Sequence, residues 1–348
     1  MLMLKFFSKG TTLLLAVITS AVITTPCYAQ VVSFTSIAAS TSAEFNGFGN
    51  PSLNRAGVVA FRASRDSTAG GGTGIYTATD VNAFTTVALS SSPEFSAFSD
   101  PTINLGGTVA FYADRDAGGA GIYTAFNTSV FTAIALTSSP EFNSFIGRPN
   151  INDGGLVVFQ AGRDAGGEGI YTATSSASFN SIARTSSPEF SALGLPDINN
   201  AGVVSFHAGR DVGGQGVYTA TSFSAFTTIA LSSSPEFSIF SITGINNSGL
   251  IAFMANRDAG GQGIYTAFNQ TSFTTVITTD SPAFTGLGAP ALNDAGTIAF
   301  IANSADGGSG IYAKQVNGAS LIPIIRTGDT LVAVAGRSTG SDPHHPYG

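Results

Sequence analysis

A repeat of about 47 residues runs through nearly the whole chain and constrains its fold more than any other feature. Its clearest mark is a tyrosine preceded by glycine and then isoleucine or valine, found at Tyr76, Tyr123, Tyr171, Tyr218, Tyr265 and Tyr312. An asparagine recurs at nearly the same step, at Asn54, Asn104, Asn152, Asn199, Asn246 and Asn293. Six copies therefore cover residues 34–320, and each is expected to be one supersecondary unit that buries its apolar faces against its neighbours.

The second copy shows what one unit contains. Residues 84–89, 95–103, 108–113 and 121–125 are short runs of β-branched and apolar side chains, so all four are expected strands. Asparagine, aspartate and glycine clusters separate them and predict turns. No segment has helical periodicity. The sequence thus predicts an all-β fold, a β-propeller of four-stranded antiparallel blades, whereas a β-helix would need a shorter period.

Six blades are expected, with seven as the alternative. The inner strands occur six times, but residues 34–39 read as an extra outer strand, and residues 330–335 are a further strand-like run. These two segments are expected to close the ring or to form part of a seventh blade. We therefore divide the chain into a leader, a propeller and a flexible polar tail: residues 1–29, 30–337 and 338–348.

The leader has the three parts of an export signal. Lys5 and Lys9 precede an apolar stretch within residues 11–25, and residues 27–29 offer a cleavage site before Gln30. The stretch is short for a membrane span, so we expect a cleaved signal and no span in the mature chain. The expected location is outside the cell, at its surface or in the periplasm. Cleavage would remove the single cysteine, so the mature fold is expected not to depend on disulfides.

Composition and histidine content argue against several functions. A net charge of −7 with only 10% charged residues disfavours nucleic acid and anionic membranes as partners. His207 occupies a position that varies freely among the copies, and His344 and His345 lie in the expected tail. The mature chain therefore offers almost no histidine that could activate a serine or cysteine nucleophile. Phosphate-binding and zinc motifs are missing from the sequence. We expect no catalytic residue, no cofactor and no enzyme activity.

Charged residues that recur in step with the repeat are the candidate binding residues. A glutamate enters each blade and an Arg-Asp pair follows the second strand, and propeller topology is expected to bring both loops to one face. The sixth copy has Ala283 and Ala305 instead, which predicts that glutamate and arginine pair, because losing only one would leave an unpaired charge. The hypothesis is a ring of five such pairs, with ligand binding as its functional interpretation and Ca²⁺ at the aspartates as a weaker one. The residues are Glu94, Glu141, Glu189 and Glu236; Arg115, Arg163, Arg210 and Arg257; and Asp116, Asp164, Asp211 and Asp258; with Glu44, Arg65 and Asp66 in the first copy.

The segment Asn104-x-x-Gly107-x-x-Ala110-Phe111 resembles the repeat of the bacterial NxxGxxAF tandem-repeat proteins, which are exported and end in one of several anchors. Three other copies keep the motif, whereas Val158 and Ser205 replace its alanine in the remaining two. The run from this motif to the next Gly-Ile-Tyr is also similar, more distantly, to the WD40-like blade of TolB-type propellers. The resemblance covers residues 34–329 and implies a propeller and export, and it brings no catalytic residues.

Three classes of function follow. The leading expectation is an exported, non-enzymatic scaffold that binds an unknown protein or glycan partner, and a lectin-like form predicts repeated pockets because near-identical copies make near-identical sites. The first alternative is a cell-surface or matrix component that self-associates through uncharged outer strands such as residues 226–231. The second is a propeller hydrolase or lyase, whose site would consist of acidic or histidine residues that break the repeat around the channel.

Overall fold

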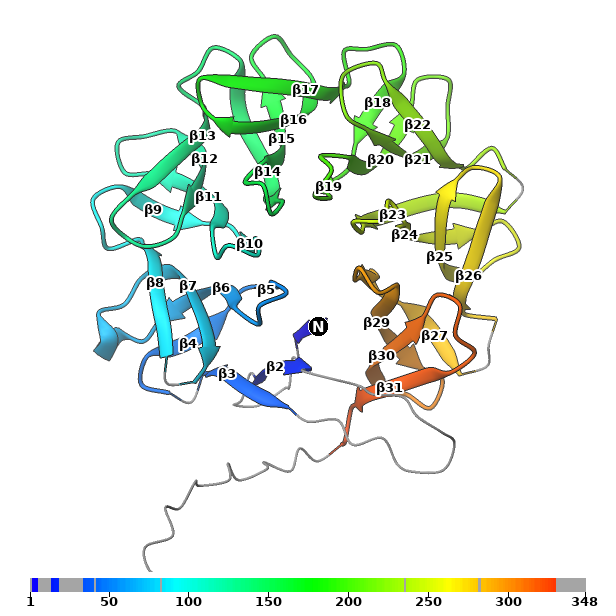
Figure 1. The fold of residues 1–348 in the computed structure, drawn as a ribbon, viewed down its shortest axis with the longest axis horizontal. Helices are drawn as coiled ribbons and strands as arrows, with labels where there is room; N and C mark the ends of the chain where they lie inside the picture. Colours follow the sequence, from blue (N-terminus) through cyan, green and yellow to red (C-terminus); the bar gives the residue numbers. More distant parts are fainter. Residues whose placement is uncertain are drawn as a thin grey trace, which may run out of the picture.

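The apolar runs of the repeat form strands that assemble into a ring of sheets (Figure 1). The computed structural model describes residues 2–5, 14–18, 34–40, 42–81, 83–234, 236–280 and 283–329. Within these residues the regular structure is β, apart from a single 3₁₀ turn at Ser67–Ala69 (η1), and none of it is a helix with the length and apolar character needed to span a membrane. The protein is an all-β six-bladed β-propeller with antiparallel blades, as the sequence predicts.

Each blade pairs its strands in sequence order, from the centre of the ring outward. Blade 1 contains β4 (Phe45–Phe48), β5 (Ser52–Leu53), β6 (Val59–Arg65), β7 (Thr73–Asp80) and β8 (Ala83–Leu89); blade 2 contains β9 (Phe95–Phe98), β10 (Thr102–Ile103), β11 (Val109–Arg115), β12 (Ala120–Ala125) and β13 (Phe131–Leu136); blade 3 contains β14 (Phe142–Ile151), β15 (Val157–Arg163), β16 (Glu168–Ser175) and β17 (Ser178–Arg184). Blade 4 contains β18 (Phe190–Leu193), β19 (Asp197–Ile198), β20 (Val204–Arg210), β21 (Gln215–Ala220) and β22 (Phe226–Leu231); blade 5 contains β23 (Phe237–Ile245), β24 (Ile251–Arg257), β25 (Gln262–Asn269) and β26 (Ser272–Thr278); blade 6 contains β27 (Phe284–Leu287), β28 (Ala291–Leu292), β29 (Thr297–Ser304), β30 (Ser309–Gln315) and β31 (Leu321–Arg326).

The innermost strand is split in two in blades 1, 2, 4 and 6, where the sequence predicts one continuous strand. A proline lies in the gap of each split strand, at Pro51, Pro101, Pro196 and Pro290. Proline has no N–H to donate to the ladder, so pairing is interrupted there. Pro149 takes the same place in blade 3 without splitting β14, whose pairing with β15 instead shifts register between Ile146 and Asn150. Blade 5 lacks a proline at this place, and its β23 is continuous.

The Ala-Phe pair of the repeat places a small and a large side chain on opposite faces of each blade. Ala110 and Phe111 in β11 are both fully buried. Phe111 packs against residues of blade 1 and stacks on Tyr123 of its own blade, with ring centroids 6.1 Å apart. Ala110 faces the other way and packs in one cluster with Phe159 of blade 3. The core therefore lies between blades, because the phenylalanine of each of blades 2 to 6 packs against the blade before it. At the junction of blades 6 and 1, Ala299 instead packs with Phe34, and Phe61 packs with Ile37.

A three-stranded sheet of β1 (Leu2–Lys5), β2 (Leu14–Ile18) and β3 (Thr35–Ala39) lies between the first and last blades (Figure 1). Ile37 of β3 packs into the core of blade 1, and Phe34 packs against Ile311 and Ile325 of blade 6. The segment at residues 34–39 therefore joins the first blade to the last. The second expected closing segment at residues 330–335, the tail with His344 and His345, and the cleavage site lie outside the described residues.

Candidate functional site

The glutamate and arginine loops predicted to meet do lie side by side in every blade. The backbone N–H of Asp164 donates to the carbonyl oxygen of Glu141 at 3.2 Å, and the equivalent bond forms in each of the other blades at 2.9–3.3 Å. In the sixth blade it joins Ala305 to Ala283. Backbone hydrogen bonds therefore hold these loops together whether or not their side chains are charged.

Side-chain pairing is less regular than the sequence predicts. Arg65 pairs with Glu44 at 3.2 Å in blade 1, and Arg163 pairs with Glu141 at 3.3 Å in blade 3. In blade 5, Arg257 pairs with Asp280 instead of the predicted glutamate.

Within the described residues, the glutamates of blades 2, 4 and 5, Glu94, Glu189 and Glu236, form no ion pair with their arginines. The predicted ring of five pairs is thus present in two blades and incomplete in three.

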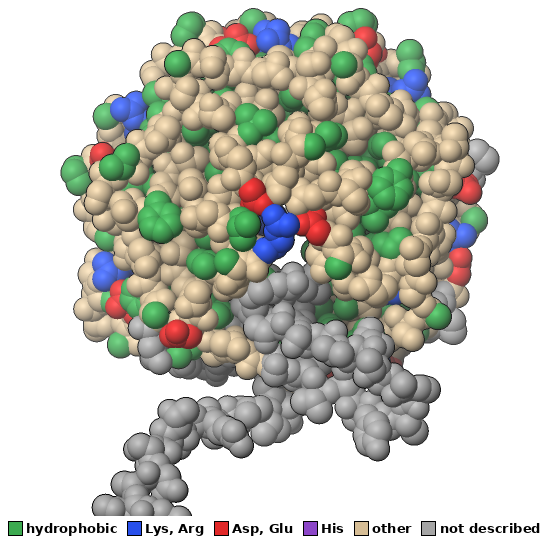
Figure 2. Space-filling view, viewed as in Figure 1, with side chains coloured by type: hydrophobic (Ala, Val, Ile, Leu, Met, Phe, Trp, Pro, Cys, Tyr) green, Lys and Arg blue, Asp and Glu red, His purple; other side chains and the backbone are tan. Residues whose placement is uncertain are grey.

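In two of the three blades without the pair, a cavity lies at the edge of the blade. A cavity of about 270 Å³ in blade 4 is lined by Glu189, Arg210, Tyr218 and Phe226. A cavity of about 530 Å³ in blade 5 is lined by the equivalent residues: Glu236, Arg257, Tyr265 and Phe273. We call these two the rim cavities, and basic and acidic side chains are indeed seen around the edge of the disc (Figure 2).

The exposure of the repeated tyrosine differs in the same way between blades 1 and 3 and blades 4 and 5. Tyr76 and Tyr171 lie beside formed pairs and are 1% and 0% exposed, whereas Tyr218 and Tyr265 at the rim cavities are 5% and 6% exposed. Burial raises the pKa of Tyr218 and of Tyr265, and the neighbouring arginine opposes the shift in each case. Each rim cavity is therefore lined by a protonated hydroxyl, a guanidinium, a carboxylate and an aromatic ring, and in blade 5 the guanidinium also binds Asp280.

A belt of asparagines surrounds the axis of the ring. The Nδ2 group of each repeated asparagine donates to the backbone oxygen of the next one, at 2.9–3.3 Å in five successive steps from Asn54 to Asn293. The Oδ1 atom of the same residue accepts a hydrogen bond from the N–H four residues later, as in Asn152 with Leu156. One side chain thus shapes the turn of its own blade and ties that turn to the next blade.

The residue after each of these asparagines lines a cavity of about 510 Å³ that we call the channel mouth. These residues are Arg55, Leu105, Asp153, Asn200, Asn247 and Asp294. Arg55 bridges the axis, because its guanidinium binds Asp153 on one side and Asp294 at 2.9 Å on the other. Figure 2 shows a basic side chain between two acidic ones at the centre of the face.

Hydrogen bonds and charge fix the ionised state of Asp153. Burial alone would raise the pKa of Asp153, but hydrogen bonds from the Leu105 N–H and the Asn200 amide, with the charge of Arg55, hold it below the usual value. Sequence reasoning missed this Arg–Asp–Asp group. The available signal was that the residue next to an invariant asparagine differs among the copies and includes three charges.

His207 has the surroundings of a packed strand residue. It is half-buried, burial lowers its pKa, and its ring lies against Gly194 of the same blade. At equivalent positions Arg62 binds Asp100 of the next blade at 3.1 Å, and Gln160 binds the carbonyl of Leu193 in the next blade. The position therefore serves contact between blades. Across the described residues, no group of three histidine, cysteine, aspartate or glutamate side chains is placed to hold a metal.

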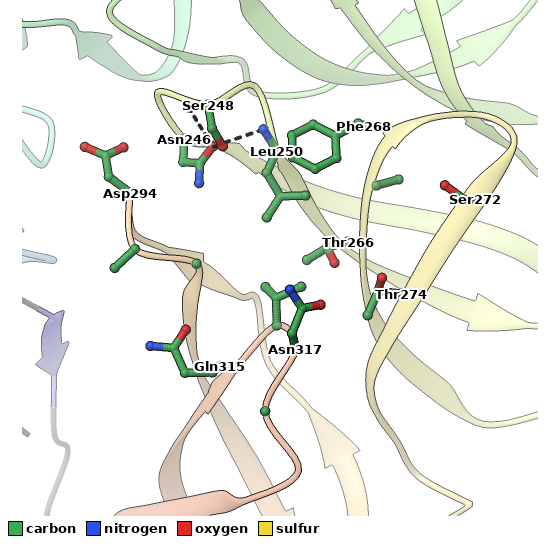
Figure 3. Close-up of a pocket in the computed structure, with 15 residues that line it drawn as sticks. Asn246, Ser248, Leu250, Thr266, Phe268, Ser272, Thr274, Asp294, Gln315 and Asn317 are labelled. Atoms are coloured by element: carbon green, nitrogen blue, oxygen red, sulfur yellow. Dashed lines mark hydrogen bonds between the residues drawn. The ribbon is translucent and has the colours of Figure 1, made fainter. Parts of the chain in front are cut away.

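A groove of about 560 Å³ separates blades 5 and 6 next to the channel mouth (Figure 3). One wall comes from β25 and β26, with Phe268, Ser272 and Thr274, and the opposite wall from residues 315–318 of the hairpin between β30 and β31. Asp294 lines both the groove and the channel mouth. We call this the blade 5/6 groove.

Comparison with known proteins shows a likeness of fold alone. No protein-family model and no curated protein matches the sequence. TolB from Acinetobacter baumannii is similar over 72% of this chain and 59% of that chain, with 12% identity and a TM-score of 0.48. The GH74 enzyme of Niastella koreensis is similar over 83% and 48%, with 14% identity and a TM-score of 0.49. The BP39L lectin from Burkholderia pseudomallei is similar over 90% and 92%, with 13% identity and a TM-score of 0.47. The chain spans about three fifths of this TolB and about half of this GH74 enzyme.

Proposed function

We propose that this chain is an exported, non-enzymatic binding scaffold of the NxxGxxAF repeat type that presents several pockets to a protein or glycan partner. The observation that carries the proposal is that one cavity recurs at equivalent positions of blades 4 and 5. A rigid ring with equivalent sites binds a repetitive partner through several contacts at once, so weak single sites add up to a strong interaction.

The chemistry of the rim cavities favours a partner with both donors and acceptors. Glu189 and Arg210 lie in the same cavity without pairing, so a purely anionic or purely cationic ligand would meet one favourable and one unfavourable charge. Hydroxyl or amide groups can donate to the carboxylate and accept from the guanidinium. Glycans and peptide segments both carry such groups, and Phe226 supplies an apolar surface beside them.

The charges at the channel mouth support a scaffold over a hydrolase or lyase. The Asp294 carboxylate accepts hydrogen bonds from Arg55 and from both the backbone and the amide of Asn247. Asp153 is bound in the same way by Leu105, Asn200 and Arg55. A general acid or base needs a pKa near the working pH and access to the substrate proton. The lowered pKa of Asp153 opposes the first requirement, and the hydrogen bonds that occupy both carboxylates oppose the second.

A thermal melt of the purified chain with a glycan panel and with Ca²⁺ tests the proposal. A ligand that binds only the folded state stabilises it by about 2.7 kcal/mol at a hundredfold excess over its dissociation constant. We expect a glycan-dependent rise in the midpoint that Arg210→Ala and Arg257→Ala both reduce. Arg326→Ala is the matched control, because Arg326 lies over Tyr312 in the blade that lacks the Glu–Arg pair. Turnover of a panel compound, or equal effects of all three substitutions, would contradict the proposal.

A further inference from the structure

The blade 5/6 groove has an aromatic wall, because Phe268 is placed differently from the equivalent residue of blade 2. Phe268 is 57% exposed, and Phe126 is the equivalent residue of blade 2, at 61% exposed. The ring of Phe126 covers Gly107, where an added Cβ would lie 2.8 Å from it. At the equivalent Gly249 of blade 5, no atom lies within 4 Å of such a Cβ. The ring of Phe268 therefore does not cover the turn of its own blade, and it lines the groove instead.

The groove also contains a buried hydroxyl that has no partner. Thr266 is 1% exposed, and its Oγ1 makes no hydrogen bond to any residue that the structure describes. Buried polar groups in folded proteins are almost always paired, so an unpaired one needs an explanation. Thr266 lies between the two walls of the groove, below Phe268 in the view of Figure 3. A ligand hydroxyl in the groove would supply the missing partner.

The charge of the groove restricts its ligand to a neutral one. Of the described residues that line it, Asp294 alone is ionisable, and both of its oxygens are already engaged by Arg55 and Asn247. A charged ligand would lose its hydration without meeting a free opposite charge. The remaining polar groups include the hydroxyls of Ser272 and Thr274 and the amide of Asn317, all of which both donate and accept.

We propose that the blade 5/6 groove binds one unit of a neutral saccharide. A pyranose ring has an apolar face for Phe268 and hydroxyl groups that suit Thr266, Thr274 and Asn317. The volume lies in the range of about 300–1,000 Å³ that is usual for small-molecule sites. This proposal rests on the proposed binding function, and it adds a ligand class and a single site distinct from the rim cavities.

Titration of the full chain with neutral sugars tests the proposal. The probes are the methyl glycosides of glucose, galactose, mannose and N-acetylglucosamine, followed by saturation-transfer NMR and calorimetry. We expect at least one to bind, and Phe268→Ala to raise its Kd about tenfold, as truncation of an aromatic anchor commonly does. Thr266→Val keeps the side-chain shape and is expected to weaken binding several-fold. Phe126→Ala is the control, since it removes an equally exposed ring outside the groove.

Each outcome separates this site from the broader function. If no glycoside binds while a protein partner does, the saccharide proposal is overturned and the scaffold proposal stands. If a glycoside binds but Arg210→Ala abolishes the binding and Phe268→Ala does not, the sugar belongs to a rim cavity. If a peptide binds the groove in a way that depends on Phe268 and no glycoside does, the ligand is a peptide and the saccharide proposal is overturned. Unchanged melting midpoints of the variants confirm that the fold is intact in each case.

Discussion

Replacing Asn152 by alanine is expected to weaken the joint between blades 3 and 4. The side chain is 6% exposed; its amide donates to the carbonyl of Asn199 at 3.1 Å, and its oxygen accepts from the N–H of Leu156 at 2.9 Å. Alanine removes both bonds. The N–H of Leu156 is left without its partner, whereas the carbonyl of Asn199 loses the bond between blades but keeps the one from the N–H of Gly202. The substitution therefore tests whether the asparagine belt contributes to the free energy of unfolding of the ring.

The expected loss is about 2–4 kcal/mol of unfolding free energy, because the unpaired N–H of Leu156 costs about 1–3 kcal/mol and the lost hydrogen bond between blades about 1 kcal/mol. Asn293 provides a matched control. Its oxygen accepts from the N–H of Thr297 at 2.8 Å, but within the described residues its amide makes no bond to the next blade. Asn293→Ala leaves the N–H of Thr297 unpaired and is therefore expected to cost about 1–3 kcal/mol, so the difference of about 1 kcal/mol between the two variants isolates the bond between blades.

Equilibrium unfolding in urea measures both variants against the parent chain. The denaturant midpoint is expected to fall more for Asn152→Ala than for Asn293→Ala, with little change in the slope, since the surface exposed on unfolding stays the same. Equal losses in the two variants would refute the reasoning, because the bond between blades would then contribute nothing. A loss below about 0.5 kcal/mol at Asn152 would mean that water replaces both partners without cost.

Four further predictions follow from named groups. Burial raises the pKa of Asp197 in the folded chain, so the stability that this group contributes is present below its ordinary pKa and is lost as pH rises through the folded pKa. Asp197→Ser keeps an acceptor for the N–H of Ile245, as Ser52 does for the equivalent N–H of Ile103. The variant is expected to melt at a higher temperature than the parent at pH 7, and the difference should close toward pH 4. Burial lowers the pKa of His207 in the folded chain, so below the ordinary value of 6.5 the unfolded chain binds the proton first and folding loses stability. His207→Met introduces the residue that blade 5 has at the equivalent Met254. The variant is expected to lose less stability than the parent between pH 7 and 5, as measured by melting midpoints. Arg55→Leu is expected to cost less than about 1 kcal/mol, because Arg55 is half exposed, and the difference from the parent should shrink as sodium chloride is raised in urea melts. Expression with the leader intact is expected to yield a mature chain that begins at Gln30, which the intact mass of the exported protein checks.

The blade itself could be predicted because the sequence states each local signal six times. The Ala-Phe pair, as in Ala110 and Phe111, shows directly that one face is small and the other large, and stacking neighbours in a ring is the arrangement that buries both. The breaks in the innermost strands were missed although Pro101 and its equivalents mark them. A proline inside an apolar run stops the ladder locally without ending the unit, so the period of the repeat does not reveal it.

Side-chain pairing was harder to predict than loop adjacency. Adjacent loops follow from the order of the strands, and the backbone bond from Asp258 to Glu236 forms as that order requires. The side chain of Arg257 nevertheless turns to Asp280, a residue outside the predicted set. In blade 3, Arg163 does pair with the predicted Glu141, and Arg184 also lies 3.8 Å from that carboxylate. Which carboxylate an arginine meets depends on residues that differ between copies.

The Arg–Asp–Asp group lay beyond sequence reasoning because its members belong to different blades. Arg55 is 98 residues from Asp153 and 239 residues from Asp294, and only the closure of the ring brings all three to one axis. No spacing within a single repeat encodes that meeting. Variation after the invariant asparagine was visible in the sequence, but the direction in which those side chains point was not.

Two kinds of variation among the copies have different causes. At the position shared by Arg62, Gln160 and His207, the side chain meets a local packing or hydrogen-bonding requirement. Arg62 pairs with Asp100 of the next blade, whereas His207 packs on Gly194 of its own blade. The positions of Arg55, Asp153 and Asp294 share no apolar core, so packing does not dictate their identities. Each nevertheless depends on the others, because removing the arginine would leave two carboxylates facing each other across the mouth. Coordinated differences of this kind set the three positions apart from that of Arg62, because their identities follow from one another across the ring and not from the packing of a single blade.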